Sequence, residues 1–158
     1  MAPNLHEILA AIPLFSTLEP AEIAEFVRYM ANQSFTANQP ILVEGHPPPG
    51  LYVILDGKVA VMKRRGEDAD LICDLDGGEC VGEVEIIDNT DCTASVVSYG
   101  NVETAVIVKE NLEAFFTTYP AAANKILRQI VRVLAARLHQ ANISYSSLMH
   151  IAESIGDE

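Results

Sequence analysis

The stretch LYVILDGKVAVM, residues 51–62, carries the clearest strand and turn signals in this sequence. Two runs rich in Val, Ile and Leu flank Asp56-Gly57, a dipeptide that favours a tight reversal between antiparallel strands. The stretch therefore predicts a β-hairpin formed by residues 51–55 and 59–62. It also places β-structure in the middle of the chain.

Short apolar runs of the same kind continue on both sides of this segment. Turn-forming pairs such as Glu44-Gly45, Arg65-Gly66 and Gly100-Asn101 separate them, with no helical pattern in between. Short, regularly spaced strands without intervening helices are typical of an antiparallel sandwich or roll. The predicted strands are residues 41–43, 51–55, 59–62, 71–75, 96–97 and 102–108.

Helical patterns flank this β zone. Apolar residues recur at helical spacing in residues 5–30, which predicts two short helices, the second beginning at Pro20. A short helix in residues 111–119 ends before Pro120, because a residue that precedes proline is disfavoured in the α conformation. A long helix then runs from Pro120 to residue 155. We therefore expect a single, mainly β domain over residues 1–158, with N-terminal helices in 1–34, a β roll in 35–108 and C-terminal helices in 109–155.

The last predicted helix is longer than the domain to which it belongs. About 30 of its residues alone would span about 45 to 50 Å, whereas a compact chain of this size has a diameter of about 40 Å. Apolar residues along it alternate in spacing between four and three, the pattern of a coiled-coil seam. This pattern predicts a parallel homodimer; the alternative is that the last turns fold back on the N-terminal helices or fray. The seam residues are Leu127, Val131, Leu134, Leu138, Ala141, Tyr145 and Leu148.

The charge balance argues against several classes of partner. The chain has 10 Lys plus Arg against 22 Asp plus Glu, a formal net charge of −12. Such a charge opposes binding to nucleic acids and to anionic membrane surfaces. No apolar run approaches the roughly 18 residues that a membrane span needs. Three cysteines, an odd number, in a chain without a secretory leader favour free thiols in the reducing cytoplasm.

The order of the parts resembles a known family. Glu44-Gly45, the turn LDGKV at 55–59, Gly82-Glu83 and FFTTYP at 115–120 occur in the order found in the cyclic-nucleotide-binding domain family, of the catabolite activator protein and protein kinase A regulatory subunit type. The resemblance extends from about Ile12 to Asn142. It implies a jelly-roll-like, antiparallel β roll with N-terminal helices and a long C-terminal helix.

The resemblance also implies a ligand pocket in GEVEIIDNTDCTAS, residues 82–95. In this family the Gly-Glu pair opens a helical turn whose backbone N–H groups face the cyclic phosphate. The Glu accepts a hydrogen bond from the ribose 2′-hydroxyl, and an Arg roughly nine residues later contacts the phosphate. Glu83 matches the Glu, whereas Cys92 stands at the Arg position. The candidate pocket residues are Gly82, Glu83, Val84, Glu85, Cys92, Thr93, Ala94 and Ser95.

The missing Arg predicts weak phosphate recognition. Losing a charge-assisted hydrogen bond costs about 1.5 to 3 kcal/mol, or roughly ten- to more than a hundredfold in affinity. Glu85 and Asp91 make the pocket rim more anionic, and no Arg or Lys occurs between Arg65 and Lys109. We therefore expect a regulatory module with a degenerate pocket that binds cyclic nucleotides weakly or not at all. The alternative is a working cAMP or cGMP receptor that signals to a separate, unidentified protein partner.

Enzymatic and metal-binding functions have little support. Cys92 has no His near it in the sequence, and the four His residues are scattered over different predicted elements. We expect no catalytic residue, no metal and no cofactor. Family members that bind DNA carry a further module after the long helix. Only 16 residues follow Asn142 here, so we expect no direct nucleic-acid binding.

Overall fold

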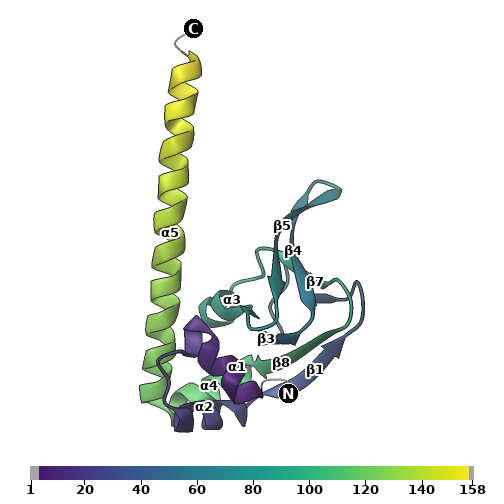
Figure 1. Cartoon of the computed structure of the whole chain (residues 1–158), viewed down its shortest axis with the longest axis vertical. Helices are drawn as coiled ribbons and strands as arrows, with labels where there is room; N and C mark the ends of the chain where they lie inside the picture. Colours follow the sequence, from purple (N-terminus) through teal and green to yellow (C-terminus); the bar gives the residue numbers. More distant parts are fainter. Residues whose placement is uncertain (1–3, 157–158) are drawn as a thin grey trace.

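The computed structural model describes residues 4–156 and confirms the mainly β roll with flanking helices. Two four-stranded antiparallel sheets, in the orders β1-β8-β3-β6 and β2-β7-β4-β5, form its centre. The helices gather on one side of the roll, and α5 extends far beyond it (Figure 1). The strands are β1 Ala31–Phe35, β2 Pro40–Leu42, β3 Gly50–Asp56, β4 Lys58–Arg65, β5 Asp68–Asp76, β6 Cys80–Val81, β7 Ser95–Ser98 and β8 Val102–Val108.

The reversal at Asp56-Gly57 is not a hairpin, so that prediction is wrong. β3 pairs with β6 and β8, whereas β4 pairs with β5 and β7, and the chain therefore crosses from one sheet to the other here. Gly57 has a φ of 98°, and a Cβ atom on it would lie 2.6 Å from the carbonyl oxygen of Asn101. A crossover between sheets and a hairpin can both require a glycine with positive φ at the turn. The local sequence therefore cannot distinguish them.

A hairpin does form one strand later, between β4 and β5. Arg65 pairs with Asp68, and Gly66 occupies the turn with a φ of 63°. All but one of the nine residues of β5 are exposed, and this strand is the edge of its sheet.

Two strands were not predicted, and both lack an apolar pattern. β1 is mostly polar, and all of its residues except Phe35 are exposed, so the sheet begins before the expected boundary at residue 35. β6 has two residues, too few to show any periodicity. Both strands form through pairing with distant partners, β8 and β3 respectively.

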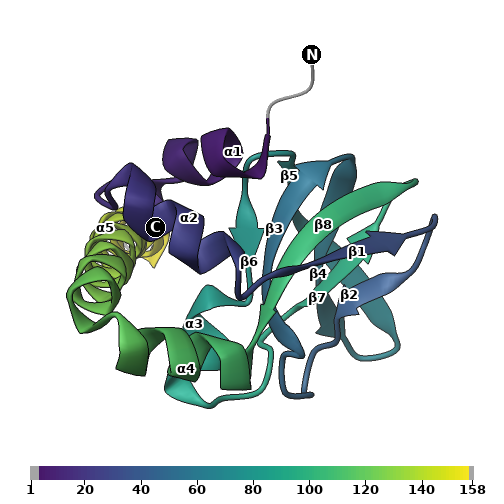
Figure 2. The same ribbon diagram turned by 90° about the horizontal axis from the view of Figure 1, so that it is seen from below.

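The helices agree with the proline signals. α2 has Pro20 at its first position, and α4 stops immediately before Pro120, where α5 begins. Figure 2 shows α1, α2 and α4 between the roll and the base of α5. The helices are α1 Leu5–Ala11, the short 3₁₀ helix η1 Pro13–Phe15, α2 Pro20–Val27, α3 Glu83–Asp88, α4 Lys109–Thr118 and α5 Pro120–Gly156.

Two apolar clusters form the core. One fills the roll between the two sheets. The other lies under the helices, where Phe26 packs against Phe15 and Phe115 with ring centroids 5.0 and 4.9 Å apart. Ile126 and Ile130 of α5 join this second cluster, so the base of α5 is fixed to the domain.

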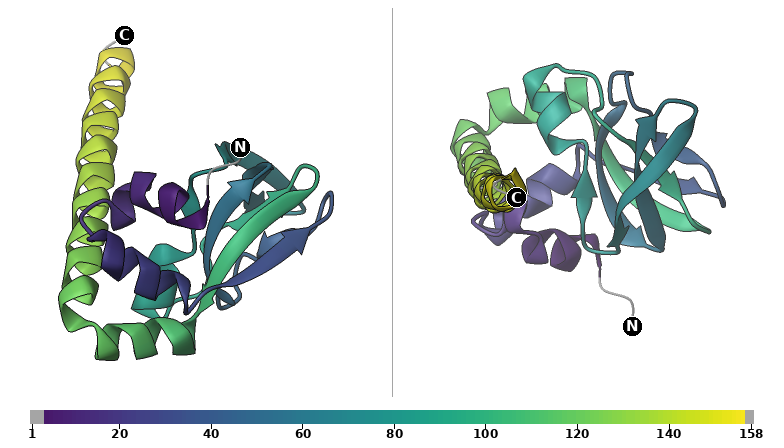
Figure 3. Two further views of the ribbon diagram at one scale, coloured as in Figure 1. Left: turned by 60° about the horizontal axis from the view of Figure 1, so that its bottom comes forward. Right: turned by 90° about the horizontal axis from the view of Figure 1, so that it is seen from above.

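Ile130 is the last residue of α5 in this core cluster, and beyond Arg137, which still contacts Glu83, the helix extends away from the domain. Its 37 residues correspond to a length of about 55 Å. The predicted seam residues lie in this helix and are exposed, with 65% of Val131 and 63% of Leu138 accessible to solvent. The left view in Figure 3 shows the C-terminal part of α5 standing clear of the roll. The single chain therefore leaves an apolar stripe without a covering surface.

Candidate functional site

A cavity of about 350 Å³ lies where the β roll meets α3 and α5. It brings together most of the predicted pocket residues, since both the Gly-Glu segment and the loop before β7 form its wall. Cys92 and Ser95 do not line it. The lining residues are Leu42, Val61, Cys73, Leu75, Cys80, Val81, Gly82, Glu83, Val84, Glu85, Thr93, Ala94, Val96 and Arg137.

Gly82 sets the start of α3 at the cavity wall. Its φ is 82°, a conformation that favours glycine, and a Cβ atom would lie 2.8 Å from the carbonyl oxygen of Gly50. This close approach brings Glu83 and Glu85, in the first turn of α3, to the cavity.

Cys92, at the position of the family Arg, is buried in the core of the roll. Only 3% of the residue is exposed, and it belongs to the cluster between the sheets. Its backbone N–H donates to the carbonyl of His46 and its carbonyl accepts from the N–H of Gly45, both at 2.8 Å. Burial raises the pKa of the Cys92 thiol, and the charge of Glu85 raises it further. The Arg position therefore offers neither a phosphate ligand nor a reactive thiolate.

Ser95 has a structural contact in place of a ligand contact. Its hydroxyl accepts a hydrogen bond from the backbone N–H of Glu44 at 2.9 Å, which ties the start of β7 to the end of β2. Ser95 lines a different pocket, together with Ala60 and Met62 of β4.

Lys63 is a cation at the site that sequence reasoning missed. Its Nζ donates to the carbonyl of Thr93 at 2.5 Å and lies 2.9 Å from a carboxylate oxygen of Glu44. The two-residue period of β4 could have indicated it, because Val61 lines the cavity and residues two apart share a face of the sheet. Lys63 therefore contacts the pocket segment although it comes from a distant strand, β4.

Arg137 is a second missed cation, and it comes from α5. It lines the cavity, and its Nη2 lies 3.6 Å from Oε1 of Glu83. The helical spacing could have indicated this position. Arg137 follows Ile130 by seven residues and Val133 by four, so it lies on the same inner face of the helix as these two residues.

Carboxylates at the cavity wall offset the charge of the cations near it. Burial raises the pKa of Glu83, and the nearby charge of Glu85 acts in the same direction, while Arg137 opposes the shift. The two cations that approach the cavity, Lys63 and Arg137, each lie beside a carboxylate.

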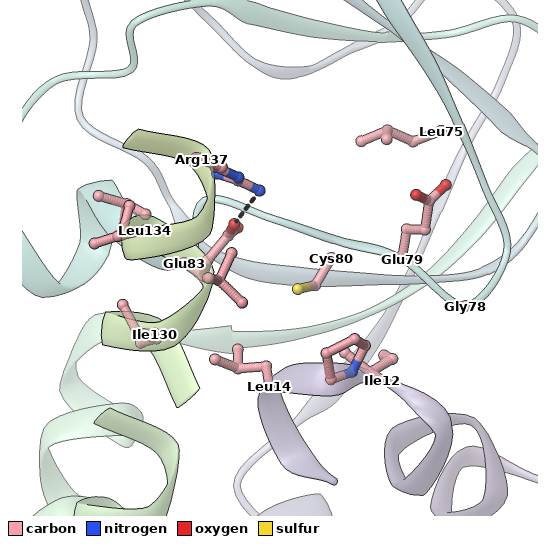
Figure 4. A pocket seen from close by; sticks show the side chains of 13 residues that line it. Ile12, Leu14, Leu75, Gly78, Glu79, Cys80, Glu83, Ile130, Leu134 and Arg137 are labelled. Carbon is pink, nitrogen blue, oxygen red and sulfur yellow. Dashed lines mark ion pairs between the residues drawn. The ribbon is translucent and has the colours of Figure 1, made fainter. Parts of the chain in front are cut away.

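A second, more apolar cavity of about 200 Å³ lies next to the first, between η1, α3 and α5. Figure 4 shows Glu83 and Arg137 meeting on one side of it, with Leu14 and Ile130 on the side of the helices. The Glu83–Arg137 pair therefore stands at the boundary shared by both cavities.

Other kinds of site receive no support from the part of the chain that the structure describes. Within residues 4–156, no helix is both long and apolar enough to span a membrane. The same residues contain no group of three or more His, Cys, Asp and Glu side chains arranged to hold a metal ion.

A β roll with a cavity walled by a Gly-Glu turn, and with a long helix leading away from it, is the arrangement expected of a cyclic nucleotide-binding regulatory domain. The comparison with protein families agrees. The model of the cyclic nucleotide-binding domain matches residues 32–119, so the chain belongs to this family and the predicted resemblance is confirmed.

Similar proteins and a similar solved structure support the assignment to this family. The chain is 27% identical over 146 residues to a "CRP-like cAMP-activated global transcriptional regulator" of Mycobacterium tuberculosis, covering 92% of this chain and 63% of the relative. It is 28% identical over 101 residues to a "cAMP-dependent protein kinase regulatory subunit" of Neurospora crassa, covering 64% and 26%. The solved catabolite activator protein of Thermus thermophilus superposes with a TM-score of 0.76 at 26% identity, covering 86% and 62%. The chain thus spans less than two thirds of the length of each of these proteins.

Proposed function

We propose that this chain is a non-enzymatic regulatory module that forms a homodimer through α5 and binds cyclic nucleotides weakly or not at all. One observation carries the proposal: both cations that approach the cavity are already paired, Lys63 with Glu44 and Arg137 with Glu83. A cyclic phosphate would have to displace a carboxylate to gain either of them.

The position of Cys92 supports the same reading. A desolvated phosphate needs charge-assisted donors, and losing one weakens binding by about 1.5 to 3 kcal/mol. A buried thiol in the core of the roll supplies no such donor. Glu83 and Glu85 at the cavity wall add repulsion, because like charges destabilise each other in a partly desolvated site.

The exposed stripe on α5 supports the homodimer. A contiguous apolar helix face in water is unfavourable, and a second copy of the same stripe would cover it in a coiled coil. The heptad spacing continues past Leu148 to Ala152 and Ile155, within the described helix. The seam therefore extends over most of the length of α5.

The proposed module acts in a reducing compartment and signals through a protein partner. Its three cysteines are free thiols, which suits a reducing compartment such as the cytoplasm. The net charge of −12 favours signalling to a separate protein partner over direct contact with nucleic acid or membrane.

The alternative function is a working cAMP or cGMP receptor domain that signals to that partner. Two observations favour it. The chain belongs to a family of cyclic nucleotide-binding domains, and Lys63 and Arg137 lie close enough to the cavity to serve a phosphate if their carboxylate partners move.

Isothermal titration calorimetry on the full chain separates the two functions. We expect cAMP and cGMP to bind with a dissociation constant weaker than about 100 μM, or without detectable heat, which is less favourable than about −5.5 kcal/mol. Adenosine, which lacks the phosphate, is the neutral control. A micromolar or tighter constant for either cyclic nucleotide would establish the receptor function and refute the degenerate pocket.

A further inference from the structure

Arg137 reaches the ligand cavity from an element outside the β roll. It follows the last buried residue of α5, Ile130, by two turns and lines both cavities beside α3. In Figure 4 its side chain projects from α5 toward Glu83. The ion pair therefore joins the pocket segment to the helix that carries the apolar seam.

The two partners of this pair differ in their exposure to water. The side chain of Glu83 is 13% exposed, whereas that of Arg137 is 63% exposed. Because a poorly hydrated carboxylate pays a large desolvation cost, Glu83 depends on its cation more than Arg137 depends on its anion. Drawing Arg137 away would leave a buried charge without its partner.

We propose that Arg137 is the specificity-determining residue of this cavity and that Glu83, by holding it, makes the cavity select against anionic ligands. This inference rests on the proposed function, since it explains why that pocket would refuse a cyclic phosphate. An anion must compete with Glu83 for the guanidinium and then lies beside an unpaired carboxylate. A neutral, hydroxylated molecule, such as a nucleoside, can instead donate a hydroxyl hydrogen to Glu83 and leave the pair in place.

The Glu83→Gln variant tests this inference. Gln keeps a carbonyl oxygen that accepts a hydrogen bond, but it does not retain the cation. We expect cAMP affinity to rise by about tenfold or more, the gain expected for a charge-assisted contact. Adenosine affinity should change by less than about threefold, because no charge interaction is added. If Glu83 served chiefly as an acceptor for a ribose hydroxyl, the same substitution would weaken cAMP binding.

Three further variants identify the cause of any gain. Glu85→Gln is the matched control, since it removes one negative charge from the same cavity without releasing an arginine. It should raise cAMP affinity less than Glu83→Gln does. The double variant Glu83→Gln/Arg137→Gln should lose the gain, and Glu83→Gln/Arg137→Lys should retain part of it. Circular dichroism and thermal unfolding would verify that each variant folds.

The outcomes also separate this inference from the proposed function. No gain in Glu83→Gln, or a gain that persists without Arg137, would overturn the inference and leave the weak-binding module intact. Micromolar cAMP binding by the unaltered chain would overturn the proposed function. If the unaltered chain discriminates against cAMP relative to adenosine, and only the variants that release Arg137 lose this discrimination, the result would support both the inference and the proposed function.

Discussion

The Nζ atom of Lys63 lies 2.9 Å from Oε1 of Glu44, while the same ammonium donates to the carbonyl of Thr93. The hydrogen bond from Lys63, together with one from the backbone N–H of Arg64, lowers the pKa of the Glu44 carboxyl. Glu44 is therefore a carboxylate at neutral pH, and it holds Lys63 at the edge of the loop that forms the cavity wall.

We expect the Lys63→Gln substitution to leave the weak cAMP affinity within about twofold of the original, because the ammonium is already paired and contributes little to an anion. An NMR titration can detect binding in the millimolar range. Lys58→Gln on the same strand, whose own pair with Asp76 is longer at 3.9 Å, is the matched control. A tenfold loss confined to Lys63→Gln would identify this lysine as a phosphate ligand and favour the receptor function.

A second ion pair predicts how stability depends on pH. Lys125 Nζ lies 2.8 Å from Glu22 Oε2, linking α5 to α2, and this hydrogen bond lowers the pKa of Glu22 below its usual value of 4.5. A depressed carboxyl pKa stabilises the fold above pH 4.5, and the contribution disappears as the pH falls through the folded-state pKa. Lys125→Met should therefore lower the free energy of unfolding by about 0.5 to 1 kcal/mol at pH 7 and by less at pH 3.

Urea denaturation at the two pH values measures this difference. Lys58→Met provides the control, since it makes the same substitution in a more exposed pair. An equal loss for Lys125→Met at pH 7 and pH 3 would show that packing of the lysine chain, and not its charge, stabilises the contact.

The thiols should differ in reactivity. Cys73 is exposed, whereas burial raises the pKa of Cys80 to about 12 and also raises the pKa of Cys92. Because the thiolate is the reactive form, a disulfide reagent at pH 8 should modify one thiol rapidly in the folded protein and all three in denaturant. Cys73→Ser should abolish the rapid phase. Rapid labelling of Cys92 in that variant would contradict the buried position found for it.

The seam of α5 can be tested with a charge. Leu138→Asp would place a carboxylate at the centre of the apolar stripe, and we expect it to raise the dimer dissociation constant by about tenfold or more. Gln140→Asp adds the same charge two residues away, off the seam, and should have little effect. Sedimentation velocity over a range of concentrations gives both values. A monomer at all concentrations, or equal effects of the two variants, would refute the proposed dimer.

Much of the fold could be predicted because the decisive signals are local. Pro20 and Pro120 begin helices where the restricted proline backbone suits the first turn. The apolar strands also lie where the Val-rich runs predicted them. The crossover at Gly57 could not be predicted, because the partner strands of β3 and β4 are chosen by contacts far away in the sequence.

The candidate site could be predicted only in part, and for the same reason. Gly82 and Glu83 follow from the motif, and the structure places them at the cavity wall. Lys63 and Arg137 come from other elements and meet the cavity through the packing of the whole domain. The inward direction of Cys92 depends on how its loop pairs with Gly45 and His46, which a linear motif does not encode.

Because α5 is long, a small change in its direction at the base moves its far end by a larger distance. The helix is anchored at Ile130, and the 26 residues that follow extend about 39 Å to Gly156. A tilt of about 5° at the anchor would displace the far end by about 3 Å. A small rearrangement beside Glu83, which contacts α5 through Arg137, would therefore produce a larger movement at the far end of the helix.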